Sequence, residues 1–110
     1  MQILSSIGTK SETNEDVILR TLLDGHCRAI LGVTTGNPST ASAISLACNM
    51  PLSTVYRRLK TLRALKFLHV SCTLRPDGKK LLLFQNRLVG IDISWNDAKL
   101  QISTNFSSVM

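Results

Sequence analysis

The sequence predicts an α+β domain in which a small helical core is followed by two β-hairpins. Two observations predict this fold class. Between residues 14 and 64 the apolar residues recur with the period of a helix, and after Phe67 that period changes to two, as in strands. Capping and turn-forming residues stand between the periodic segments, where each element should end.

The length of 110 residues leaves room for one domain with a hydrophobic core. We expect an N-terminal arm over residues 1–11, the domain over residues 12–104 and a tail over residues 105–110. The longest apolar runs are too short to span a bilayer, and the N-terminus lacks the basic start and apolar run of a secretion signal. We therefore expect a cytoplasmic protein without a membrane partner.

Two short helices are expected to open the domain. The first covers residues 14–23 and the second residues 25–34, with Asp24 as N-cap of the second because its side chain can accept bonds from the first turn. The apolar residues of each helix fall on one stripe: Val17, Ile18 and Leu22 in the first, and Cys27, Ile30 and Leu31 in the second. The Gly36-Asn37-Pro38 segment ends this part of the chain.

The third and fourth helices follow with a link of about three residues between them. Ser39 or Thr40 caps the third helix, which Asn49 closes, and Pro51 starts the fourth. We expect the fourth helix to cover residues 51–66. Its apolar stripe is formed by Leu52, Val55, Leu59 and Leu62, and its other side by Ser53, Arg57, Lys60 and Ala64, flanked by Thr54, Tyr56 and Thr61.

The first hairpin is expected over residues 69–85. Its strands flank a turn at residues 75–79, in which Pro76 and Gly78 stand where turn geometry favours them. The basic residues Lys79 and Lys80 lie at the tip of this hairpin.

The second hairpin follows from the alternation of Val89, Ile91, Ile93 and Trp95 with polar residues and glycine. An Asn96-Asp97 turn of two residues would place Trp95 opposite Ala98, Ile93 opposite Leu100 and Ile91 opposite Ile102. The resulting apolar face is too large for a lone ribbon to leave in water. It must therefore cover the helices or another subunit.

Positive charge is concentrated in one part of the chain. Residues 51–80 have a net charge of +7, whereas residues 1–50 sum to −1 and residues 81–110 to zero. The cations are Arg57, Arg58, Lys60, Arg63, Lys66, Arg75, Lys79 and Lys80, and the single acid is Asp77. The electrostatic field of such a localised positive charge attracts polyanions, of which nucleic acid is the commonest in a cell.

The order of three helices, a basic helix and a hairpin is that of a winged helix-turn-helix domain. Residues 52–62, LSTVYRRLKTL, resemble the recognition helix of archaeal winged-helix regulators of the arsenical-repressor-like (ArsR) group. The similarity extends over residues 14–104, through Leu23-Asp24, Cys27–Leu31, Ser39–Ala41 and the closing hairpin. It implies a DNA-binding regulator of transcription.

Two departures from this group matter. Many members have glycine where the recognition helix ends, and Lys66 would cost about 1–2 kcal/mol in a left-handed conformation there. We therefore expect the helix to continue by part of a turn and to change the angle of the wing. The metal-sensing branch has a close cysteine pair in this helix, which is lacking here, so metal regulation is not expected.

The predicted DNA-binding residues are Ser53, Thr54, Tyr56, Arg57 and Lys60 on the fourth helix, and Arg75, Lys79 and Lys80 at the wing tip. Arg57 is the best candidate to read a guanine edge with two hydrogen bonds. Ser53 and Thr54 suit hydrogen bonds to bases or phosphates, and Tyr56 and Lys60 suit phosphates. The three wing residues suit contacts with phosphates or with the minor groove. Arg58 and Arg63 lie nearer the core and are expected to bury their stems and reach a carboxylate or phosphate. The alternative for the whole set is a solvated surface.

Neither a catalytic constellation nor a metal site is predicted. The glycines form no phosphate-binding loop, the acids show no acid–base pattern, and His26 and His69 are single histidines. Cys27, Cys48 and Cys72 are far apart in the sequence and are expected to be buried packing residues. We expect no cofactor and no enzymatic activity.

The sequence thus favours a sequence-specific regulator that binds double-stranded DNA as a homodimer, since one recognition helix reads only a few base pairs. The final hairpin and the first helix offer apolar surface for pairing, with Trp95 either in the interface or in the core of its own chain. Two alternatives stand beside this hypothesis. One is a winged helix that binds an acidic protein partner in a transcription assembly, and the other is a regulator switched by a ligand or a thiol.

Overall fold

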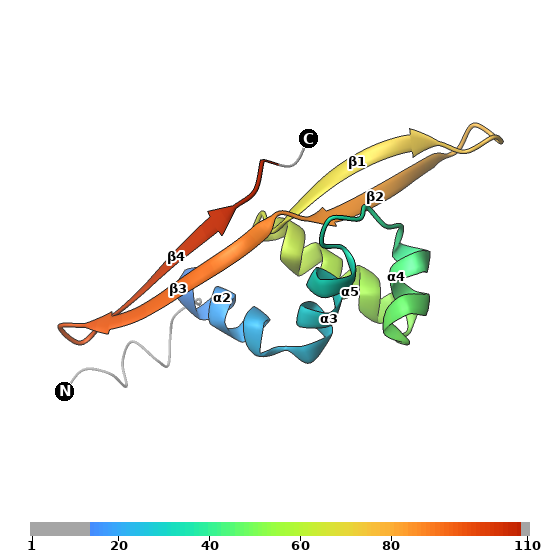
Figure 1. The fold of residues 1–110 in the computed structure, drawn as a ribbon. Coiled ribbons are helices and arrows are strands. Elements are labelled where there is room, and N and C mark those ends of the chain that lie inside the picture. The colour runs from blue at the N-terminus through green and yellow to red at the C-terminus, as the bar shows by residue number, and fades with distance from the viewer. Residues whose placement is uncertain (1–13, 109–110) are drawn as a thin grey trace.

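A computed structural model describes residues 14–108, which form four helices followed by four strands (Figure 1). The helices are α2 (Asn14–Leu23), α3 (Gly25–Val33), α4 (Ala41–Cys48) and α5 (Leu52–Ala64). The strands are β1 (Leu68–Leu74), β2 (Lys80–Asn86), β3 (Leu88–Asn96) and β4 (Lys99–Phe106). This arrangement confirms the predicted fold class, α+β with the elements of a winged helix-turn-helix domain. The arm predicted over residues 1–11 lies outside the described residues, and β4 continues two residues beyond position 104.

Local capping fixes the ends of the core helices. The Asp24 carboxylate accepts a bond of 3.1 Å from the His26 backbone N–H, as predicted for this cap. Of the two candidates for α4, Thr40 is the N-cap, and its hydroxyl accepts from the Ala43 N–H at 3.1 Å. Asn49 closes α4 in the left-handed conformation, with φ 51°.

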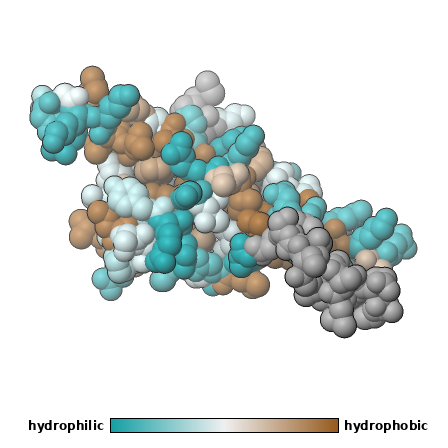
Figure 2. Space-filling model, turned by 180° about the vertical axis from the view of Figure 1, so that it is seen from behind, coloured by the Kyte–Doolittle hydropathy of each residue, from teal (hydrophilic) through white to brown (hydrophobic). Residues whose placement is uncertain are grey.

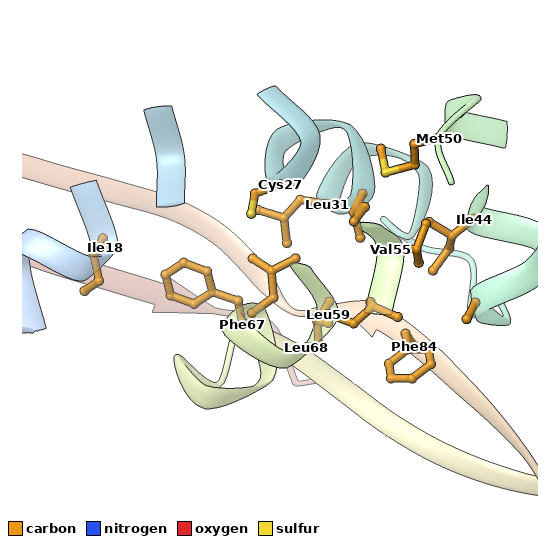
Figure 3. Close-up of a cluster of buried hydrophobic side chains, with 13 residues drawn as sticks. Ile18, Cys27, Leu31, Ile44, Met50, Val55, Leu59, Phe67, Leu68 and Phe84 are labelled. Atoms are coloured by element: carbon orange, nitrogen blue, oxygen red, sulfur yellow. The ribbon is translucent and has the colours of Figure 1, made fainter. Parts of the chain in front are cut away.

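The core draws apolar side chains from all four helices and from the wing (Figure 3). Its buried members are Ile18, Cys27, Ile30, Leu31, Ala41, Ile44, Met50, Val55, Leu59, Leu62, Phe67, Leu68 and Phe84. The predicted stripe of α5 holds for three of its four residues. Leu52, the first residue of the helix, lies beyond the edge of the core and is 41% exposed, whereas Thr54 is buried.

The end of α5 differs from the prediction. The helix begins at Leu52 and ends at Ala64 instead of covering residues 51–66, and Lys66 adopts the left-handed conformation with φ 64°. The N–H of Phe67 donates to the Leu62 carbonyl at 3.0 Å and that of Lys66 to the Arg63 carbonyl at 2.9 Å, which is a Schellman motif.

The burial of two side chains explains why the chain accepts this conformation. The turn at Lys66 places Phe67, 1% exposed, and Leu68, 6% exposed, in the core. Full burial of each is worth about 1.5–3 kcal/mol, which together exceeds the cost of about 1–2 kcal/mol for a left-handed lysine.

We call residues 68–86, comprising β1, β2 and their turn, the wing. Its strands pair antiparallel from Leu68 opposite Asn86 to Leu74 opposite Lys80, within one residue of the predicted bounds. The segment before α4 extends the sheet, because Ser39 and Phe84 exchange two backbone bonds of 2.9 and 2.8 Å. The wing is therefore fixed to the N-terminus of α4 as well as to the end of α5.

We call residues 88–106 the C-terminal hairpin, and its register differs from the prediction. The turn residues are Asp97 and Ala98, both with positive φ, instead of Asn96 and Asp97. Trp95 faces Leu100 and Ile93 faces Ile102, a shift of two residues. A shift of two keeps every side chain on its predicted face, and it gives Trp95 a large apolar neighbour in place of Ala98.

The two hairpins extend from the helical body in opposite directions (Figure 1). The molecule therefore measures 61 × 28 × 23 Å, and its radius of gyration is 16.5 Å against about 13 Å for a compact domain of this length. β4 packs against α2, and Ile91 and Ile102 adjoin the core. The part of the hairpin nearer its turn lies outside this cover: Ile93 is 53% exposed and Trp95 68%, so Trp95 is not a core residue of its own chain.

Candidate nucleic-acid interface

The side of α5 opposite the core presents a row of polar and basic side chains to solvent. Those exposed along it are Ser53, Tyr56, Arg57, Lys60 and Arg63. Four of the five predicted helix residues therefore lie where a ligand can reach them. Arg63, predicted nearer the core, is exposed on the same helix and adds a further cation to this row.

Thr54 is the exception to this exposure. Its side chain is buried, and its hydroxyl accepts a bond of 3.3 Å from the Arg57 Nη2 atom. Successive residues of a helix point about 100° apart, so Thr54 lies at the border of the stripe of Val55, Leu59 and Leu62, where packing between elements covers it. The Thr54 hydroxyl is therefore bonded to Arg57, and Thr54 does not share the exposed face of the other four predicted residues.

Arg58 fulfils the prediction that its head would reach a carboxylate. Its Nε atom lies 2.5 Å from Oδ2 of Asp24, the N-cap of α3, so this pair ties α5 to the start of α3. Desolvation of the Asp24 carboxylate raises its pKa, but bonds from the Cys27 thiol and the His26 N–H, with the charge of Arg58, outweigh it and lower the pKa overall.

The wing tip is exposed and carries the other three predicted cations. Arg75 pairs with Asp77 at 3.3 Å, with both side chains about half exposed, so the pair adds little stability and reduces the positive charge available at this point. Lys79 and Lys80 are exposed. Figure 2 shows hydrophilic residues at the end of the wing and hydrophobic ones between it and the body.

The helix face and the wing meet in space. Tyr56 from α5 and Lys80 from β2 line one cavity of about 260 Å³, together with the first residues of α4. The structure thus brings the basic helix and strand β2 of the wing to the same side of the molecule.

The three cysteines differ in their surroundings. Cys27 is buried, Cys48 is half-buried and Cys72 is exposed, so the prediction of three buried thiols is wrong for Cys72. The apolar alternation of β1 continues beyond the body, and Cys72 stands on the part that projects into solvent. Within residues 14–108 the acids, histidines and cysteines form no cluster of three that could hold a metal ion. Nor does any helix in that range have the length and apolarity to cross a membrane.

Comparison with known families agrees with this geometry. Residues 22–71 match the family model of a helix-turn-helix domain, which covers the chain from the end of α2 through α5 into β1. No curated protein sequence matches the chain. The fold and this match define a winged helix-turn-helix domain, and they support a DNA-binding regulator of the helix-turn-helix class.

Proposed function

We propose that the chain is a sequence-specific regulator of transcription that binds double-stranded DNA, with α5 in the major groove and the wing along the backbone. The observation that carries this proposal is the convergence of the exposed basic face of α5 and strand β2 of the wing on one side of the molecule. Apart from Asp77 at the wing tip, the charged residues of α5 and of the wing are all cations, which suits a polyanion. The resemblance of residues 52–62 supports a place among archaeal ArsR-like regulators.

Within this proposal the residues have separate tasks. Arg57 reads a guanine edge, with Thr54 behind it as a support, and Ser53 bonds a base or a phosphate. Tyr56 and Lys60 bind phosphates beside the groove. Arg75, Lys79 and Lys80 hold the backbone or enter the minor groove at the wing tip.

The division between base and phosphate contacts can be tested with two variants. Arg57→Ala should lose about 1–3 kcal/mol of binding free energy on the preferred site and much less on random duplex. Lys79→Ala should weaken binding to all duplexes alike and reduce the salt slope by about one. The preferred site comes from selection among random duplexes, and affinities are measured by fluorescence anisotropy at several salt concentrations.

Two results would contradict the proposal. An equal loss on specific and random DNA for Arg57→Ala would remove Arg57 from base recognition. Binding without any sequence preference or salt dependence would favour the alternative of a module that docks an acidic protein.

We further propose that the regulator acts as a homodimer that pairs through the C-terminal hairpin, together with α2. The exposed Ile93 and Trp95 support this proposal, since they continue an apolar face that α2 covers only at its base. Two copies would provide two recognition helices for two half-sites.

A further inference from the structure

A groove lies between α5 and the wing strand β2, and the proposed DNA contacts do not use its floor. Its volume is about 440 Å³, within the range of small-molecule sites. Its lining residues are Tyr56, Leu59, Lys60, Arg63, Ala64, Leu82 and Phe84.

The floor and walls of this groove are apolar. Leu59 and Phe84 are 2% and 4% exposed and belong to the core, so the groove reaches down to the core surface. Leu82, 43% exposed, and Tyr56 stand along its walls. A DNA phosphate needs hydrogen-bond donors, and this floor offers none.

The rim of the groove is positively charged. Lys60 and Arg63 stand three residues apart on α5, hence on neighbouring positions of one helix face, and both are exposed. Among residues 14–108 the lining includes no acidic residue. The neighbouring cavity shares Tyr56, Leu82 and Phe84 with the groove and adds Lys80 to its lining, again with no acid from the described part of the chain.

From this combination we infer that the groove binds an amphipathic monoanion, a molecule with an apolar chain and one carboxylate. The chain would lie on Leu59, Leu82 and Phe84, and the carboxylate would pair with Lys60 or Arg63. Tyr56 and Lys60 line the groove and also belong to the proposed DNA face, so an occupant opposes DNA binding. This second part rests on the proposed function, whereas the binding of the anion does not.

The test uses the full chain and three probes in titration calorimetry below their micelle concentrations. Decanoate should bind saturably with one molecule per chain. Butanoate, with the same head and a short chain, and decyl maltoside, with the same chain and no charge, should each bind at least ten times more weakly. Absence of saturable decanoate binding, or equal binding of the neutral detergent, would overturn the inference.

A matched pair of variants locates the site. Leu82→Ser removes a wall of the groove and should weaken decanoate binding at least tenfold. Leu74→Ser is the control, because Leu74 is exposed on the same face of the wing but does not line the groove. Equal effects of the two changes would place decanoate elsewhere.

A rim variant separates the role of charge from that of folding. Arg63→Ala should weaken decanoate binding several-fold and leave the weak binding of decyl maltoside unchanged. Circular dichroism checks that each variant is folded. An unchanged decanoate affinity in both Arg63→Ala and Lys60→Ala would overturn the assignment of the carboxylate to this rim.

The effect on DNA is measured separately with the selected duplex. Decanoate should reduce the duplex affinity of the wild type at least fivefold and that of Leu82→Ser by less than twofold. Unchanged duplex affinity with a filled groove would overturn the competition. If the wild type binds no duplex at all, the proposed function fails, while the calorimetric result still decides whether the groove is a binding site.

Discussion

Lys66 holds a backbone conformation that its side chain disfavours, and the residues that follow compensate for it. The left-handed turn allows Phe67 and Leu68 to enter the core, so the strain is a local cost of joining α5 to the wing. The Arg87 guanidinium lies near the Lys66 carbonyl at 3.5 Å and spans the same junction.

Replacement of this lysine should therefore stabilise the protein. We expect Lys66→Gly to raise the free energy of unfolding by about 1 kcal/mol, because glycine adopts this conformation without strain. Urea unfolding followed by circular dichroism measures the change. Asn49→Gly is the matched control at the other left-handed helix end, and its gain should be smaller because asparagine tolerates the conformation. A loss of stability in Lys66→Gly would contradict this account of the junction.

The thiols give a second prediction at the residue scale. Cys72 is exposed, whereas burial and a bond to Asp24 raise the pKa of the Cys27 thiol to about 12, and burial raises the pKa of Cys48. Since the thiolate is the reactive form, one equivalent of a thiol reagent should react quickly with the native protein at neutral pH. The other two equivalents should react only when denaturant is added.

The control for this labelling is Cys72→Ser, which should abolish the fast equivalent. A fast phase that persists in Cys72→Ser would mean that Cys27 or Cys48 opens readily to solvent. Loss of DNA binding on labelling of Cys72 alone would support the thiol-switched alternative.

At the scale of elements, the C-terminal hairpin is held in register by its cross-strand pairs more than by its turn. Asp97 and Ala98 occupy a two-residue turn in which both have positive φ, a geometry that favours Asn-Gly or Asp-Gly. The Asn96-Asp97 alternative has better turn residues. The observed register instead pairs Trp95 with Leu100 and Ile93 with Ile102.

A change in the turn should therefore stabilise the hairpin without altering its register. Ala98→Gly creates the Asp-Gly turn and should raise the free energy of unfolding by about 1 kcal/mol, measured by thermal or urea unfolding. Ser94→Gly, in the middle of β3, is the control and should lower it by about 0.5–1 kcal/mol. Destabilisation by Ala98→Gly would argue against the left-handed conformation of this residue.

At the scale of the whole molecule, the two hairpins extend in opposite directions, so the basic face beside the wing and the apolar face of the C-terminal hairpin lie far apart (Figure 1). The wing lies beside the basic face of α5, whereas the C-terminal hairpin extends away from it on the other side of the body. An apolar surface remote from the proposed DNA face allows two copies to pair without blocking either recognition helix. This separation is the structural basis of the dimer proposal.

The dimer proposal predicts the mass in solution. Light scattering at micromolar concentration should give twice the 12.1 kDa of the chain. Ile93→Asp should dissociate the dimer and strongly reduce operator affinity, because a charge enters an apolar interface and each monomer then reads half a site. Ser94→Asp, on the opposite face of the same strand, should leave the dimer and its operator affinity unchanged. A wild-type monomer that binds its site as a single copy would overturn the dimer and leave the DNA face intact.

Local sequence determines much of this fold. The cap at Asp24, the cap of α4 at one of two candidate residues, most positions of the helix stripes and the turn of the wing depend on contacts between residues close in the chain, so sequence patterns predicted them. The helix face with Arg57 and Lys60 follows from the same periodicity, because the buried stripe fixes which residues point outward.

Only the tertiary structure decided the remaining features, since each depends on residues distant in sequence. The extent of the core decides that Thr54 is buried and Leu52 exposed, and the burial of Phe67 and Leu68 decides that Lys66 takes a left-handed turn. Cys72 is exposed because the wing projects beyond the helical body. The groove exists because α5 and β2, distant in sequence, line it together. The periodicity of a sequence predicts which face of an element is apolar, but packing between elements decides how much of that face a neighbouring element covers.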